Sequence, residues 1–226
     1  MKLKILTAIV FSIAVAGLAR AQAPVPVELE PMHQVKFQND FVRVFDVNVP
    51  AGSTSQPHTH MYDGIRVDIS NGQISEAVMG GGNPSSKVRF GETVFTARSS
   101  PMTHTITNGG SSPIRSIFIE FLLPKKKLSG DIQLLSANHE VTFENSRVRV
   151  NKLTLTAGDS TMLHTHSVPT IAIALQDGKI EFSTLSGAAK MLEVKAGDAV
   201  WQGAGTTHIV RNAGTGAFEA IEIEIK

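Results

Sequence analysis

Two copies of one histidine pattern carry the most distinctive chemistry of this 226-residue chain. The pattern is Gly-x5-His-x-His, and it occurs at residues 52–60 and again at residues 158–166. The histidines concerned are His58 and His60 in the first copy, and His164 and His166 in the second. Two histidines separated by one residue on an extended segment point to the same face, because side chains alternate along a strand. Since neutral imidazole is the commonest protein metal ligand, each pair predicts part of a metal site.

A third histidine follows each pair. His104 lies four residues before Asn108, and His208 lies four residues before Asn212. We therefore predict two metal sites, one with the ligands His58, His60 and His104 and the other with the ligands His164, His166 and His208. The chain contains no cysteine, so any metal must be held by histidine, carboxylate, carbonyl or water.

The histidine patterns belong to a repeat that covers most of the chain. His33 aligns with His139 at an offset of 106 residues, as do the histidine pairs and their flanking glycines. The offset falls to 104 at the third histidine, so the first copy is two residues longer there. Repetition on this scale predicts two similar domains, at residues 32–124 and 132–226, joined by a linker at 125–131. Residues 22–31 contain three prolines and predict a mobile lead-in.

Short runs of alternating apolar and polar residues, separated by turn residues, predict strands in both halves. Residues 41–49 alternate in this way, and Asn71-Gly72 is a strong hairpin signal. The last run, residues 221–225, alternates isoleucine with glutamate and predicts a strand with one buried face and one wet face. We find no convincing amphipathic helix after residue 21, so we expect an all-β protein.

Residues 1–21 have the features of a secretory signal peptide. Lys2 and Lys4 make a basic start, an apolar run follows to Ala19, and Ala19-Arg20-Ala21 is a small-x-small cleavage site. The apolar run is shorter than the roughly 20 residues that a spanning helix needs. We therefore expect cleavage after Ala21, a periplasmic or secreted location and no stable membrane insertion, with an uncleaved anchor as the alternative.

The charge balance of the chain is close to neutral. The full sequence has a formal charge of +1, and removal of residues 1–21 leaves 18 basic and 20 acidic side chains, a charge of −2. A nearly neutral protein offers no electrostatic reason to bind nucleic acid. We therefore expect a small molecule as the partner and no nucleic acid.

The histidine pattern, the glycine-turned hairpin and the later Gly…His-x3-Asn segment together resemble the two motifs of the cupin superfamily. The second copy fits both motifs through Gly158, His164, His166, Gly178, Gly197, Gly205, His208 and Asn212. The first copy fits motif one equally well, but its longer second motif has Pro101 where a glycine is expected. The resemblance occurs once per half and so implies a bicupin: two tandem double-stranded β-helix, or jelly-roll, barrels. Because cupins commonly pair through their sheets, it also implies a homodimer as an option.

One departure from the cupin pattern bears on the chemistry. Motif one usually carries a glutamate seven residues before its glycine, but those positions hold Ile65 and Ile171. A three-histidine site without a carboxylate keeps the full dication charge and leaves about three octahedral positions open, which suits an anionic or bidentate substrate. Iron(II) dioxygenases of the cupin type use three histidines, and a zinc ion with a bound water fits the same ligands. We expect one or two divalent transition metal ions, from among Fe, Mn, Ni, Zn and Cu.

The predicted function is that of an exported metal-binding protein, with dioxygenase-like oxidation of a small organic substrate as the leading activity. Tyr62 and Asp63 directly follow the first histidine pair and are candidate catalytic residues, although a polar hairpin edge explains them equally well. His33 and His139 are expected to make structural hydrogen bonds. The alternatives are a non-catalytic cupin that captures a small ligand and a degenerate cupin with only an interaction role.

Overall fold

The computed structural model describes residues 22–123 and 137–226. The predicted signal peptide at 1–21 and the predicted linker at 125–131 lie outside the described residues. Within the described ranges the chain is built of strands and one short 3-10 helix, η1 (Val27–Leu29), which confirms the all-β class. No helix in these ranges is both long enough and apolar enough to cross a membrane.

The described part of the first half forms two five-stranded sheets. Sheet A has the strand order β1 (Val25–Pro26), β4 (His58–His60), β9 (Met102–Asn108), β6 (Gly72–Val78) and β7 (Ser85–Val88). Sheet B has the strand order β2 (His33–Gln38), β3 (Val42–Val49), β10 (Ile114–Phe121), β5 (Gly64–Asp68) and β8 (Thr93–Thr96). The first histidine pair therefore lies in sheet A, next to the strand that carries His104.

The second half repeats this arrangement. Sheet C has the strand order β11 (His139–Glu144), β12 (Val148–Leu155), β19 (Phe218–Ile225), β14 (Thr170–Ala174) and β17 (Ala199–Gln202). Sheet D has the strand order β13 (His164–His166), β18 (Thr206–Asn212), β15 (Gly178–Thr184) and β16 (Lys190–Val194). The strand neighbours match those of the first half, so the sequence repeat is also a repeat of topology.

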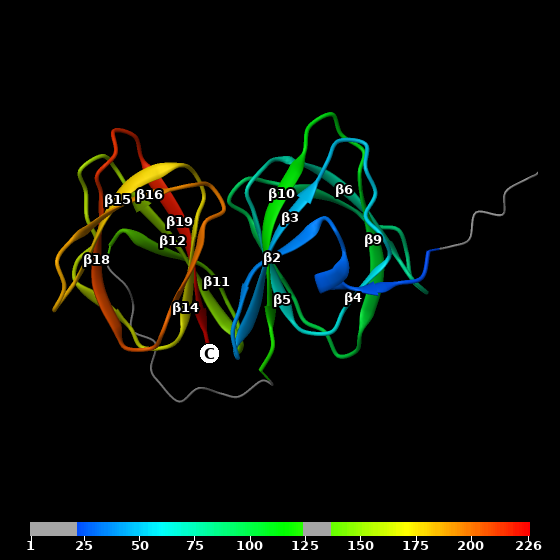
Figure 1. The fold of residues 1–226 in the computed structure, drawn as a ribbon, viewed down its shortest axis with the longest axis horizontal. Helices are drawn as coiled ribbons and strands as arrows, with labels where there is room; N and C mark the ends of the chain where they lie inside the picture. Colours follow the sequence, from blue (N-terminus) through cyan, green and yellow to red (C-terminus); the bar gives the residue numbers. More distant parts are fainter. Residues whose placement is uncertain (1–21, 124–136) are drawn as a thin grey trace, which may run out of the picture.

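Sheets B and C face each other in the middle of the molecule, and the histidine-bearing sheets A and D lie at the two ends (Figure 1). The central strands of B and C contribute alternate apolar residues to one large shared core. Its members include Val42, Val44, Ile117, Ile119, Val148, Val150, Ile221 and Ile223. The other face of each central strand points into its own half. Because residues alternate in this way, the two halves pack firmly while the opposite faces remain free to build sites.

The last strand corrects one expectation. We expected one wet face on residues 221–225, but both faces of β19 are buried. Ile221 and Ile223 are 1% and 0% exposed in the shared core, while Glu222 and Glu224 are 2% and 1% exposed inside the second half. The strand lies in the centre of sheet C, between β12 and β14. Its two glutamates are therefore interior groups, and burial of a carboxylate is costly unless a partner compensates it.

Residues 22–31 also differ from the expected mobile lead-in. Val25 and Pro26 pair in parallel with β4, with Val25 opposite His58. Val27 and Glu30 are 1% and 2% exposed. The prolines are compatible with this strand because it lies at the edge of sheet A, where a missing amide donor costs no ladder bond. The segment thus extends sheet A beside the histidine strand β4.

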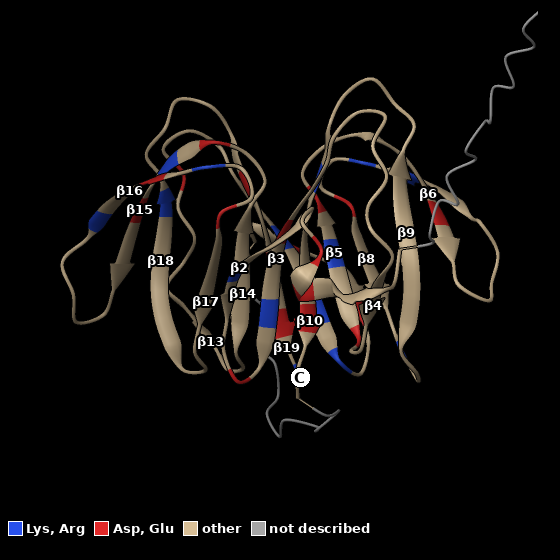
Figure 2. Cartoon of the chain, turned by 45° about the vertical axis from the view of Figure 1, so that its right-hand side comes forward, with Lys and Arg blue, Asp and Glu red and all other residues tan. Residues whose placement is uncertain are grey.

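Basic and acidic residues both occur in each half of the molecule (Figure 2). Several of the ion pairs join neighbouring strands or sheets. Arg115 of β10, for example, donates to both carboxylate oxygens of Asp46 at 2.9 and 2.7 Å, and its Nη1 donates to the carbonyl of Ala196 in the second half at 2.8 Å. These contacts add polar links around the apolar core between the halves.

Candidate metal centre

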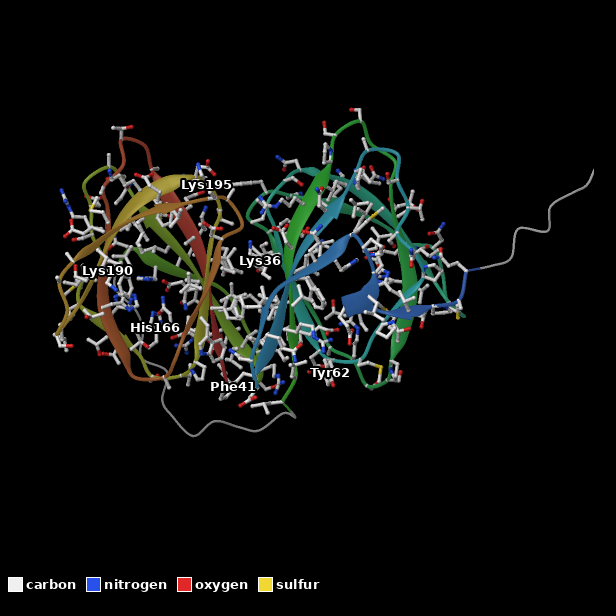
Figure 3. All side chains as sticks on the ribbon, viewed as in Figure 1. Lys36, Phe41, Tyr62, His166, Lys190 and Lys195 are labelled. Atoms are coloured by element: carbon white, nitrogen blue, oxygen red, sulfur yellow. The ribbon has the colours of Figure 1, made fainter. Side chains whose placement is uncertain are left out.

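The second half brings its three predicted ligands together. β13 pairs with β18 in a register that sets His164 opposite His208, and His166 follows two residues later on the same face. The ring centroids are 4.4 Å apart for His164 and His208, 5.1 Å for His164 and His166, and 5.2 Å for His166 and His208. One ligand nitrogen from each ring lies within 4.8 Å of the others. Figure 3 shows the labelled His166 within this half.

The first half uses the same register, with His58 opposite His104. The ring of His104 lies 4.5 Å from that of His58 and 5.1 Å from that of His60. The three nitrogens that lie within 4.8 Å of one another belong, however, to His33, His58 and His60. The first half therefore gathers four imidazoles, the three predicted ligands and His33.

His33 and His139 also lie beside the predicted ligands, a position that the sequence analysis did not assign to them. The ring of His33 lies 4.4 Å from that of His58, and the ring of His139 lies 5.2 Å from that of His164. His33 does make the expected hydrogen bond, through Nδ1 to Glu30 at 2.6 Å, which orients its ring. The matched spacing of the two histidines was the available signal, because it showed that both halves place an imidazole at the same point of the fold.

Burial favours the neutral form of four of these imidazoles. It lowers the pKa of His58 to about 3 and, with the neighbouring histidines adding to the effect, the pKa of His208 to about 4. The pKa values of His60 and His164 are also lowered, again mainly by burial. Neutral imidazole is the form that binds metal ions. These four histidines are therefore available as metal ligands at neutral pH.

The clusters also contain buried nitrogens that no hydrogen bond satisfies. Among the described residues, this applies to the Nε2 atoms of His58, His104, His164, His166 and His208. A buried polar atom without a partner costs roughly 1–3 kcal/mol, so five in two clusters indicate a missing partner. A metal ion with bonds of about 2 Å to imidazole nitrogen would supply that partner. The residues present thus fit a metal ion in each half.

Three buried carboxylates approach the clusters from the inward faces of β10 and β19. Glu120 Oε1 lies 3.2 Å from His60 Nδ1, and Glu224 Oε1 lies 3.8 Å from His166 Nδ1. Glu222 Oε2 lies 3.2 Å from His139 Nε2. Burial raises the pKa of Glu120 to about 7, against the opposing effect of Arg43 and Arg98. The sequence did not reveal Glu222 and Glu224 as interior groups, because the alternation of glutamate with isoleucine in β19 matches that of a half-exposed strand.

A cavity of about 130 Å³ adjoins the first cluster. His60, His104, Arg66, Arg98 and Phe118 are among its lining residues. The repeat offset is 106 residues at the end of β8 and 104 residues at the start of β9, so the two extra residues of the first copy lie in the loop between these strands. Arg98 belongs to this loop. The insertion therefore brings a guanidinium to the first cavity from a position that the second half lacks.

The corresponding cavity of the second half, about 180 Å³, is mainly apolar. Ala172 stands at the position equivalent to Arg66, and Phe182, Leu192 and Val200 line other parts of the wall. Glu222 is among the few charged residues in the lining. The two cavities differ much more than the two histidine clusters do, so we expect different ligands in the two halves.

The predicted catalytic pair, Tyr62 and Asp63, lies outside the cavity beside the first cluster. Tyr62 is 39% exposed and lines a separate surface depression with Arg43 and Glu120. Figure 3 shows it at the periphery of the first half. Asp63 is buried, and its Oδ1 accepts a hydrogen bond from the backbone amide of Arg98 at 2.7 Å. Asp63 therefore fixes the Arg98 loop, and the catalytic role of the pair stays a prediction.

Comparison with known proteins places this fold among solved structures. AerE from Microcystis aeruginosa is 16% identical with a TM-score of 0.62, over 91% of this chain and 98% of its own. A cupin 2 conserved barrel domain protein from Leptotrichia buccalis is 13% identical with a TM-score of 0.53, over 86% and 88%. Oxalate decarboxylase from Bacillus subtilis, a protein with Mn(II) centres, is 12% identical with a TM-score of 0.59, over 82% and 69%. No protein-family model and no curated protein sequence matches the chain.

Proposed function

We propose that this chain, which has the cupin fold, is a bicupin that binds one divalent transition metal ion in each half. The observation that carries the proposal is the convergence of imidazoles whose buried Nε2 atoms have no hydrogen-bond partner among the described residues. The tandem barrels would span residues 32–124 and 132–226. The metal identity is open among Fe, Mn, Ni, Zn and Cu, and the Mn(II) centres of oxalate decarboxylase make manganese one of the first to test.

The leading activity is oxidation of a small organic substrate, of the dioxygenase type. A bound metal would act there as a Lewis acid and as a template for substrate and O₂. The residues of the chain contribute the rest. Arg66 and Arg98 line the first cavity and favour an anionic group, whereas the wall around Phe182 in the second cavity is mainly apolar and favours an apolar group.

A second candidate function is non-catalytic capture of a small ligand in the same cavities. It is favoured by the position of Tyr62 and Asp63, because neither of these expected proton-transfer groups lines the cavity beside the first cluster. Under this function the metal and the arginines would hold a ligand without turnover. The two candidates share the metal sites and differ only in the fate of the bound molecule.

Export completes the proposal and is based on the sequence of residues 1–21 alone. A protein that matures outside the cytoplasm acquires its metal from a different pool than a cytoplasmic enzyme does. Sequencing the N-terminus of the protein recovered from the periplasm or medium tests this part. A first residue of Gln22 supports cleavage after Ala21, and an intact Met1 in a cell-associated form contradicts it.

Metal analysis of the full chain tests the central part of the proposal. The protein is purified without chelator, as the wild type and as the two double variants His58→Ala/His60→Ala and His164→Ala/His166→Ala. We expect two equivalents in the wild type and one in each variant. Oxygen uptake with small organic acids and phenols then separates oxidation from capture. Absence of metal above background after reconstitution contradicts the metal-binding proposal altogether.

A further inference from the structure

The strand registers identify equivalent positions in the two halves. Phe118 of β10 pairs with Phe45 and Arg66, and Glu222 of β19 pairs with Asn151 and Ala172. The partners of Glu222 stand 106 residues after those of Phe118. Phe118 and Glu222 therefore occupy the same place, on the inner face of the central strand of their sheets.

A second pair of equivalent positions shows the reverse exchange. Glu76 of β6 pairs with Ile106, and Phe182 of β15 pairs with Val210. These positions lie on the opposite sheets, A and D, across the site from β10 and β19. At these two positions each half has one glutamate and one phenylalanine, and the sheet that carries the glutamate differs between the halves.

The phenylalanines pack directly on ligand rings. Phe118 lies edge-on to His60 at a centroid distance of 4.9 Å, and Phe182 lies against His208 at the same distance. Phe118 therefore occupies the position that Glu222 has in the second half, and Phe182 occupies the position that Glu76 has in the first half. An apolar ring at that place lowers the local dielectric and supports the imidazole without offering a ligand.

The glutamates contact the clusters in different ways. Glu76 Oε2 lies 3.5 Å from Nδ1 of His104, and the side chain of Glu76 is 24% exposed. Glu76 therefore contacts the imidazole ring of His104, a predicted metal ligand. Glu222 is 2% exposed, and one of its oxygens lies within 4.8 Å of ligand nitrogens of both His139 and His164. Since His164 also belongs to the triad with His166 and His208, Glu222 adjoins the predicted site itself.

The electrostatics of Glu222 favour an ion beside it. The side chain of Glu222 is almost fully buried, and its Oε2 lies 3.2 Å from Nε2 of His139. A buried carboxylate that stays ionised needs a cationic partner. A metal ion held by the adjacent imidazoles would supply that positive charge directly.

We propose that Glu222 replaces the missing motif-one acid as the anionic metal ligand of the second half, while the first half keeps an all-imidazole ligand set. This inference rests on the proposed metal function. It predicts that the sites differ in preference, because carboxylate oxygen suits the harder ion Mn²⁺ whereas an imidazole set suits Zn²⁺, Ni²⁺ and Cu²⁺. Glu76 is a positioning residue, since it acts through His104.

The test measures binding of Mn²⁺ and of Zn²⁺ separately, by titration calorimetry and, for Mn²⁺, by the loss of the free-ion EPR signal. The second site is isolated in the full chain with His58→Ala/His60→Ala, and Glu222→Gln is added to that background. Loss of an indirect partner already lowers metal affinity about 10–100-fold, so loss of a direct ligand should raise the Kd for Mn²⁺ by at least about tenfold. We expect a smaller change for Zn²⁺.

Glu219→Gln is the matched control, because Glu219 lies on the same strand but on the opposite face, 2.6 Å from Lys152. Equal Mn²⁺ affinity in Glu222→Gln and Glu219→Gln would overturn the inference while leaving metal binding intact. Failure of every background to bind either metal would instead refute the proposed function, and the inference would fall with it.

A gain-of-function variant keeps the test decisive if Glu222→Gln fails to fold. Phe118→Glu in the His164→Ala/His166→Ala background places a carboxylate in the first half at the position equivalent to Glu222. We expect it to lower the Kd for Mn²⁺ relative to that background, with Phe118→Gln as the isosteric control. A folded Phe118→Glu protein with no gain over Phe118→Gln would contradict the assigned role of this position.

Discussion

Acidification should lower the free energy of unfolding of the metal-free protein. The buried titratable groups determine how steeply that free energy falls with pH. Burial lowers the pKa of His58 to about 3 and that of His208 to about 4, both below the ordinary value of 6.5. Unfolding therefore takes up a proton at each histidine as the pH falls below 6.5. Each such proton contributes a slope of about 1.4 kcal/mol per pH unit, so these two histidines reduce the free energy of unfolding by about 2.7 kcal/mol per unit between pH 6 and 5.

Glu120 acts in the opposite direction. Its pKa is raised from 4.5 to about 7, so its contribution to stability is complete below pH 4.5 and is lost as the pH rises through 7. In the same window it offsets about 1.4 kcal/mol per unit, which leaves a net loss of about 1.4 kcal/mol per unit from these three groups. His60 and His164 shift in the same direction as the other histidines and add to this loss.

The assay is urea unfolding of chelator-treated protein at several pH values between 5 and 6.5, for the wild type and for Glu120→Gln. The variant removes the opposing group and keeps an acceptor near His60, so its slope should steepen by about 1.4 kcal/mol per pH unit. A wild-type stability that is constant or increases on acidification would refute the reasoning. So would an identical slope in the two proteins.

Two further predictions concern the shared core and the fourth imidazole. Ile223→Ala removes a fully buried side chain from the core between sheets B and C and should lower the free energy of unfolding by about 2–5 kcal/mol in urea, whereas Val200→Ala, at a 57% exposed position, should change it little. His33→Ala should weaken metal binding in the first half by about tenfold or more, measured in the His164→Ala/His166→Ala background, while the second site is unaffected in the reverse background. Unchanged affinity in His33→Ala would restrict this residue to the structural role expected from the sequence.

Much of the fold follows from local patterns in the sequence. The period of two, the turn residues and the 106-residue repeat predict an all-β chain, and the registers of β4 with β9 and of β13 with β18 bring the predicted triads together. This works because a His-x-His pair on a strand has only one way to direct both rings to one face. The site residues within the two motifs could therefore be named before the fold was known.

The features that the sequence did not predict depend on long-range packing. The alternation in β19 is the same for a half-exposed strand and for one that is buried on both faces, and only the packing of sheet C on sheet B makes Glu222 an interior group. His33 comes close to His58 because sheets A and B enclose a common interior, which spacing along the chain does not reveal. The order of residues 22–31 also depends on long-range pairing. Val25 pairs with β4, although the prolines of this segment locally favour an irregular, mobile chain.

Anomalous diffraction from crystals of the metal-loaded full chain would test the central claim most directly. Data collected on both sides of the absorption edge of the bound metal locate each ion independently of activity. The account predicts two peaks, one among His33, His58, His60 and His104, and one among His164, His166, His208 and Glu222. Absence of a peak from both clusters in fully loaded crystals, or ions bound only at surface carboxylates, would contradict it.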